Sequence, residues 1–128
     1  MIYLDTSVAL AHLLGEDRVP SDALWDEVLV SSRLLEYELL TRLHARGLAK
    51  SHGAMARALL DRVALADMST TVLSRALEPF PVPVRTLDAL HLATVLFLQT
   101  QGQQLELATY DDRMAVAARK LRVPLASV

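Results

Sequence analysis

Short apolar runs alternate along this chain with longer segments in which apolar residues recur at helical spacing. The short runs predict strands over residues 2–4, 28–32, 65–68, 105–110 and 123–128, because strands buried on both faces are aliphatic throughout. The longer segments predict helices over residues 6–14, 33–47, 51–64, 69–80, 87–102 and 112–121. Strand and helix therefore alternate along most of the chain.

Hydroxyl residues and glycines mark several of the predicted helix ends. The first helix starts at Thr6 or Ser7 and stops before Gly15. Ser32 and Thr86 stand at two later starts, where a short polar side chain accepts hydrogen bonds from free backbone amides. Alternating strands and helices predict an α/β fold, a three-layer sandwich with a mainly parallel central sheet flanked by helices.

The composition excludes several classes of protein. The 128 residues are enough for one domain, residues 1–128, and 52% hydrophobic content is typical of a globular chain. The absence of cysteine excludes disulfides and thiolate metal sites and fits a cytoplasmic location. The longest apolar stretch, residues 89–98, is too short to cross a bilayer, so we expect no membrane partner.

The net charge of −2 argues against binding nucleic acid through a broadly basic surface. It leaves room for a local basic rim around an acidic centre that carries a metal ion. The positions of the charged residues decide between these two arrangements.

Carboxylates directly follow two of the predicted strands. Asp5 ends the first strand, and Asp111 and Asp112 end the strand before the last predicted helix. Asp88 falls in the first turn of another predicted helix. A single acid at a helix start is explained by capping or by the helix dipole. Because ligands of open parallel sheets bind beyond the carboxyl ends of the strands, three such positions at one sheet edge indicate a site.

A fourth carboxylate comes from the predicted helix over residues 33–47. Glu36 and Glu38 flank its buried leucine stripe on opposite sides, so periodicity leaves the choice between them open. Glu38 is also spaced to form a solvated ion pair with Arg42 one turn later. Four converging carboxylates would repel one another unless a cation compensated, and Mg²⁺ prefers such oxygen ligands. Phosphodiester hydrolysis is the chemistry that this arrangement suits best.

Four segments together resemble the motifs of one enzyme family. They read IYLDTSVAL, SSRLLEYELLTRL, RTLDALHLAT and LATYDDRMAVAAR, and they span nearly the whole chain in this order. They look like the four acidic motifs of PIN-domain ribonucleases, in particular VapC toxins of bacterial toxin-antitoxin pairs. The resemblance implies a PIN-like fold and an endoribonuclease that uses Mg²⁺ or Mn²⁺ to cut RNA. It also implies a small antitoxin protein that blocks the site, and a homodimer.

The resemblance assigns roles residue by residue. It makes Asp5, Glu38, Asp88 and Asp111 the catalytic and metal-binding acids. Glu38 matches the motif better than Glu36 because two aliphatic residues, a polar residue and an arginine follow it.

Other side chains are expected around these acids. Asp112 remains the alternative to Asp111. We expect Thr6, Thr109 and Asp112 to support the metal-binding acids without holding the ion. Arg85 and Arg113 are expected at the rim, where they would contact RNA phosphates.

His91 follows Asp88 by three residues, and we interpret it as a polar residue at the edge of a core helix rather than a ligand or general base.

A haloacid-dehalogenase phosphatase would need a second aspartate two residues after Asp5, where Ser7 stands. The serious alternative is a PIN-fold module that binds RNA or protein without cutting, and the four intact acids favour catalysis over it.

Overall fold

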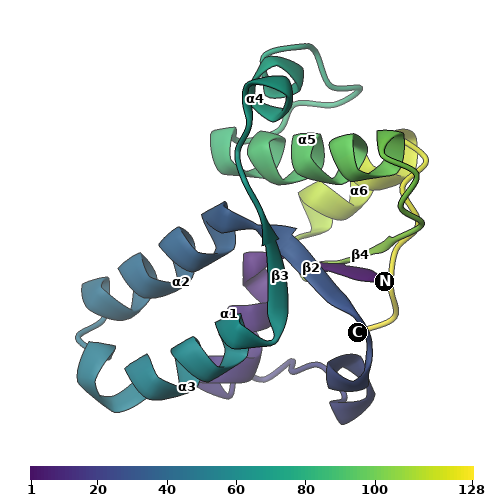
Figure 1. The fold of residues 1–128 in the computed structure, drawn as a ribbon. Coiled ribbons are helices and arrows are strands. Elements are labelled where there is room, and N and C mark those ends of the chain that lie inside the picture. Colours follow the sequence, from purple (N-terminus) through teal and green to yellow (C-terminus); the bar gives the residue numbers. More distant parts are fainter.

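The computed structural model describes residues 1–128 as a four-stranded, all-parallel sheet with helices on both faces (Figure 1). The strands are β1 (Ile2–Leu4), β2 (Leu29–Ser32), β3 (Val63–Ala66) and β4 (Glu106–Ala108). The helices are α1 (Thr6–Leu14), α2 (Arg33–Ala45), α3 (Ala49–Asp61), α4 (Thr70–Ala76), α5 (Thr86–Thr100) and α6 (Asp112–Lys120), with a 3-10 helix η1 (Asp22–Asp26). The predicted three-layer α/β sandwich is confirmed.

Strands β1, β2 and β4 each supply side chains to two separate cores. Ile2 and Leu4 of β1 pack with α1, α2 and α3. Tyr3, between them, points to the opposite face and packs with α5 and α6. This division follows from the alternation of side chains along a strand. In Figure 1 the same two groups of helices lie on either side of the sheet.

Strand β1 is the point at which the strand order reverses. The order across the sheet is β3-β2-β1-β4, so β1 pairs with β2 on one side and with β4 on the other. Beyond the last paired residues, the backbone N–H of Asp5 donates to the carbonyl of Ala108 at 3.0 Å. The segments that follow β1 and β4 therefore lie side by side at the carboxyl edge, where parallel sheets form their ligand crevices.

The helix starts agree with the sequence, but one expected cap is wrong. Ser32 caps α2, since its hydroxyl accepts from the N–H of Leu34 at 3.0 Å. Thr86 is instead the first helical residue of α5. Helix α1 begins at Thr6 as predicted, and Asp5 occupies its capping position without capping through its side chain. The side chain of Asp5 is free for other partners because it does not cap.

Three further differences concern segments with weak patterns. Strand β3 begins two residues before the predicted 65–68, and the predicted terminal strand is reduced to one isolated bridge between Leu107 and Leu125. The 3-10 helix η1 was not predicted, because five residues are too few to show a period. None of the helices combines the length and hydropathy that a membrane span requires.

Candidate active site

A pocket of about 490 Å³ opens at the carboxyl edge of the sheet, and the four predicted acids line it together. Asp5 follows β1, Glu38 lies on α2, Asp88 lies in the first turn of α5 and Asp111 caps α6. The rest of the lining consists of Thr6, Ser7, Leu10, Arg42, Arg85, Thr86 and Leu87. The fold thus brings together acids from nearly opposite ends of the sequence, Asp5 and Asp111 among them.

Asp5 is buried, and two hydroxyl groups hold one of its carboxylate oxygens. Ser7 Oγ donates to Asp5 Oδ2 at 2.6 Å, and Thr109 Oγ1 donates to the same atom at 2.8 Å. The other oxygen, Oδ1, accepts no hydrogen bond from the protein. Thr109 thus supports the acid as predicted, and Ser7 is a partner that the sequence analysis missed. The only signal in the sequence was the nearness of Ser7 to Asp5.

Glu38 is buried as well, and both of its strong hydrogen bonds reach one oxygen. Thr6 Oγ1 donates to Glu38 Oε1 at 2.9 Å, and His91 Nε2 lies 2.7 Å from the same atom. Burial alone would raise the pKa of Glu38, but its neighbours lower it below the ordinary value. The largest lowering comes from the hydrogen bond and charge of His91, followed by the Thr6 hydroxyl and the charge of Arg42. Glu38 is therefore an ionised carboxylate at neutral pH.

The structure answers the question of which glutamate faces the site. Glu38 lines the pocket, whereas Glu36 does not and makes no ion pair. Arg42 Nη2 lies 4.0 Å from Glu38 Oε2, so the predicted pair exists only as a weak contact at the mouth of the pocket.

Asp88 is half-buried and experiences the negative charge of its neighbours. Burial contributes most to its raised pKa, followed by the charges of Asp111 and Asp5, while the guanidinium of Arg85 opposes the rise. The three aspartates therefore repel one another across the pocket, as the sequence analysis expected for crowded acids.

The two oxygens of Asp111 have different partners. Oδ1 caps α6 by accepting from the N–H groups of Arg113 and Met114 at 2.9 and 3.2 Å. Oδ2 pairs with Arg85 Nη2 at 2.8 Å, and the same guanidinium reaches Asp88 Oδ2 at 3.4 Å. Arg85 thus bridges two of the acids from the rim, where its side chain is 66% exposed.

Asp112 and Arg113 are corrections to the predicted site. Both are exposed, neither lines the pocket, and their side chains make no hydrogen bond or ion pair. Asp111 occupies the capping position and turns inward, so the next two residues on the helix point away from the pocket. Of the two neighbouring aspartates, only Asp111 belongs to this site.

The donor set fits a hard divalent cation whose coordination is completed by water. No three of the carboxylates and histidines lie close enough together to share one ion directly. Mg²⁺ is usually held by only one or two carboxylates and keeps several waters, so wide spacing suits it. Asp5 Oδ1 has no protein partner. Burial first, and then the charges of Asp111 and Asp5, raise the pKa of Asp88, and a cation would offset the contribution of those charges.

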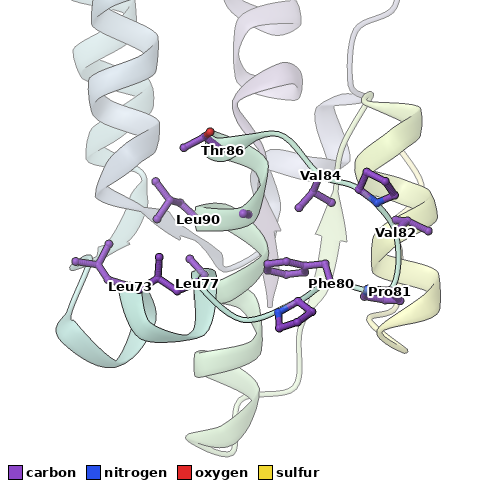
Figure 2. A pocket seen from close by; sticks show the side chains of 12 residues that line it. Leu73, Leu77, Phe80, Pro81, Val82, Val84, Thr86 and Leu90 are labelled. Atoms are coloured by element: carbon purple, nitrogen blue, oxygen red, sulfur yellow. The ribbon is translucent and has the colours of Figure 1, made fainter.

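A second hollow of about 680 Å³ adjoins the acidic pocket and is mainly apolar. Figure 2 shows that Leu73 comes from α4, Leu77 from the capping position that follows α4, Leu90 from α5 and Phe80 from the proline-rich connection. Leu73 and Leu77, which both line this hollow, are 43% and 88% exposed, and neighbouring exposed apolar side chains of this kind mark interaction surfaces. Thr86 lines both hollows, so the apolar groove leads directly to the acids.

Comparison with known proteins decides the family. The family model described as PIN domain matches residues 2–120. The chain belongs to the PIN domain family. It is 39% identical over 127 residues to Ribonuclease VapC46 of Mycobacterium tuberculosis, an alignment that covers 94% of this chain and 92% of that protein.

Two other relatives come from the same species. Identity is 36% over 132 residues to Ribonuclease VapC35, covering 94% of this chain and 92% of the relative. It is 30% over 134 residues to Ribonuclease VapC47, covering 99% and 96%. The prediction of a VapC-type PIN domain, made from four acidic motifs, is confirmed.

Proposed function

We propose that this chain is an endoribonuclease that hydrolyses RNA phosphodiester bonds in the cytoplasm with the aid of Mg²⁺ or Mn²⁺, as the toxin of a toxin-antitoxin pair. The observation that carries the proposal is the convergence of Asp5, Glu38, Asp88 and Asp111 on one pocket at the switch point of the sheet. Membership of the PIN domain family and similarity to proteins named ribonucleases support it.

Each acid has a distinct part in this proposal. Asp5 and Asp88 would hold the ion, with Glu38 and Asp111 acting on its waters. When bound, the ion lowers the pKa of a water molecule and neutralises charge that develops on a phosphate oxygen. Asp5 is suited to direct binding because two hydroxyls fix its Oδ2 and leave Oδ1 free. Glu38 is suited to orient the attacking water because its carboxylate is held ionised.

Two arginines at the rim are the candidates for RNA binding. Arg85 and Arg42 both line the pocket and are 66% and 51% exposed. An approaching phosphate would compete with the carboxylates for these guanidinium groups. Arg85 keeps the role predicted for it, whereas Arg113 lies outside the pocket.

The products of the reaction test the proposal. Attack by an activated water leaves a phosphate on one fragment and hydroxyls on the other, whereas attack by the RNA 2′-hydroxyl leaves a 2′,3′-cyclic phosphate. We expect internal RNA fragments without cyclic phosphate when the purified protein acts in Mn²⁺, as measured by mass spectrometry of the fragment ends. Cyclic phosphate ends would contradict the mechanism, and RNA binding without cleavage would favour the non-catalytic module.

The groove beside the pocket supports a partner of defined chemistry. We propose a small antitoxin protein whose apolar side chains cover Leu73, Leu77 and Phe80 and whose arginine reaches the acidic pocket past Thr86. Expression of the protein from its native operon is expected to yield a complex with a small polypeptide, detected by mass spectrometry. Leu77→Asp should release that polypeptide, and purification of the wild-type protein alone would remove support for the partner.

We also propose that the chain forms a homodimer. Light scattering of the purified protein would measure its mass, which should be twice that of one chain.

A further inference from the structure

A chain of buried polar groups connects the acidic pocket with the core on the other side of β1. Tyr3 Oη lies 2.8 Å from His91 Nδ1, and His91 Nε2 lies 2.7 Å from Glu38 Oε1. Tyr3 is fully buried in the apolar cluster between the sheet and α5, and the His91 side chain is only 2% exposed. Neither residue lines the pocket, so neither touches RNA or an ion bound there.

The hydrogens along this chain have one consistent assignment. A carboxylate only accepts hydrogen bonds, so His91 Nε2 carries the hydrogen in its 2.7 Å contact with Glu38 Oε1. Burial raises the pKa of Tyr3 far above its usual value, so the phenol keeps its proton. Where Nδ1 carries no hydrogen, the Tyr3 hydroxyl donates to it. Tyr3 thereby favours the tautomer that presents Nε2–H to the carboxylate.

These contacts restrict how Glu38 faces the pocket. Thr6 and His91 both bond to Oε1, which leaves Oε2 directed toward the mouth, 4.0 Å from Arg42. Packing alone does not require this arrangement, because apolar residues of similar volume often stabilise a core as well as buried polar groups do. Without the two donors, the flexible glutamate would be free to swing toward the exposed Arg42.

We propose that His91, oriented by Tyr3, is a positioning residue that holds Glu38 Oε1 so that Oε2 faces the divalent-ion site. This role rests on the proposed function, since it gives Glu38 a task toward the ion and its waters. Partners that orient the ligands of a metal typically change its affinity tenfold to a hundredfold when they are removed. His91, which the sequence places at the edge of a core helix, connects that core to the site through its contacts with Tyr3 and Glu38.

The test measures the affinity of the purified protein for Mn²⁺ by isothermal titration calorimetry without RNA. His91→Leu removes the donor and is expected to weaken Mn²⁺ binding up to about tenfold, the low end of the range for groups around metal ligands, because Glu38 reaches the ion through water. His91→Gln keeps an N–H group near the position of Nε2 and should restore affinity to within a few-fold of wild type. Tyr3→Phe removes only the hydroxyl and should weaken binding several-fold.

Controls separate positioning from loss of core stability. Val95→Ala removes buried volume one turn further along α5 and has no polar group, so it should lower the melting temperature in EDTA without changing Mn²⁺ affinity. If His91→Leu does not fold, Tyr3→Phe decides the question, and wild-type Mn²⁺ affinity in that variant would overturn the positioning role. If all variants fold, wild-type affinity in Tyr3→Phe together with equal affinities in the two His91 variants would overturn it.

Asp88→Asn distinguishes failure of this inference from failure of the proposed function. If wild type binds Mn²⁺, Asp88→Asn does not and the His91 and Tyr3 variants bind like wild type, the ion site stands and only the positioning role falls. If wild type binds no Mn²⁺, or Asp88→Asn binds as tightly as wild type, both proposals are overturned.

Discussion

Replacement of Asp5 or Asp88 with asparagine is expected to slow RNA cleavage by at least about a hundredfold, a size typical for the loss of one preorganised electrostatic group. Each change removes one negative charge from the pocket and leaves the side-chain volume almost unchanged. At Asp5 the change neutralises a carboxylate whose Oδ1 has no protein partner. At Asp88 it removes a negative charge that Asp5 and Asp111 repel. Cleavage rates of a labelled RNA in Mn²⁺ measure the effect.

Asp112→Asn is the matched control for this prediction. It is the same chemical change, one residue after Asp111, but its side chain is exposed and outside the pocket. The rate of Asp112→Asn should stay within about twofold of wild type, since a surface change far from any special contact has little effect. A large loss in Asp112→Asn with near-normal cleavage in Asp88→Asn would mean that the assignment of the acids is wrong.

Divalent metal is expected to stabilise the wild-type protein, and Asp88→Asn is expected to cancel most of this stabilisation. At a free Mn²⁺ concentration one hundred times its dissociation constant, binding adds about 2.7 kcal/mol to the free energy of unfolding. For a domain of this size that corresponds to roughly 10 °C in melting temperature. In EDTA the variant should melt at the same temperature as wild type or higher, because it removes repulsion among three aspartates.

The pH dependence of this comparison follows from the raised pKa of Asp88. The folded protein binds a proton at Asp88 more tightly than the unfolded chain does, so wild type in EDTA loses stability as the pH rises through the raised pKa. Below the ordinary value of 3.8 the residue is protonated in both states and the penalty disappears. The advantage of Asp88→Asn in EDTA should therefore be present at neutral pH and vanish in acid.

A purely structural role for Asp88 gives a different result. As an acid in the first turn of α5 it would favour the helix dipole, and its loss would cost about 0.3–1 kcal/mol with or without metal. Equal destabilisation in EDTA and in Mn²⁺ would show that Asp88 supports the helix and holds no ion. Differential scanning fluorimetry of both proteins in both conditions is sufficient to decide.

Much of the fold could be predicted because its strands and helices have clear periods. Aliphatic runs place β1 and β2 within a residue of their observed bounds, and Ser32 caps α2 as expected. Patterns of this kind report burial, which is local to each element. The terminal strand is reduced to one bridge at Leu125 because pairing at a sheet edge depends on tertiary contacts that the apolar run does not encode.

The site was predictable to the level of elements but not of contacts. Asp5, Asp88 and Asp111 were found because the topology of parallel sheets places strand ends at one edge, whereas Glu38 was chosen over Glu36 only through the family resemblance. Which neighbours hold them depends on side-chain directions, and Ser7, His91 and Arg85 therefore appear as partners only in the structure. Asp112 was kept as an alternative because the sequence does not show which of two adjacent aspartates turns inward at a helix start.

The most direct test of the central claim is RNA cleavage by the wild-type protein in excess EDTA and after metal is restored. The four carboxylates are proposed to act through a divalent ion, so cleavage should fall to background in EDTA and return when Mg²⁺ or Mn²⁺ exceeds the chelator. Asp88→Asn protein, purified in parallel, should remain inactive in both conditions, which excludes a contaminating nuclease. Undiminished cleavage in EDTA by the wild-type protein alone would contradict the claim that metal ions act at this pocket.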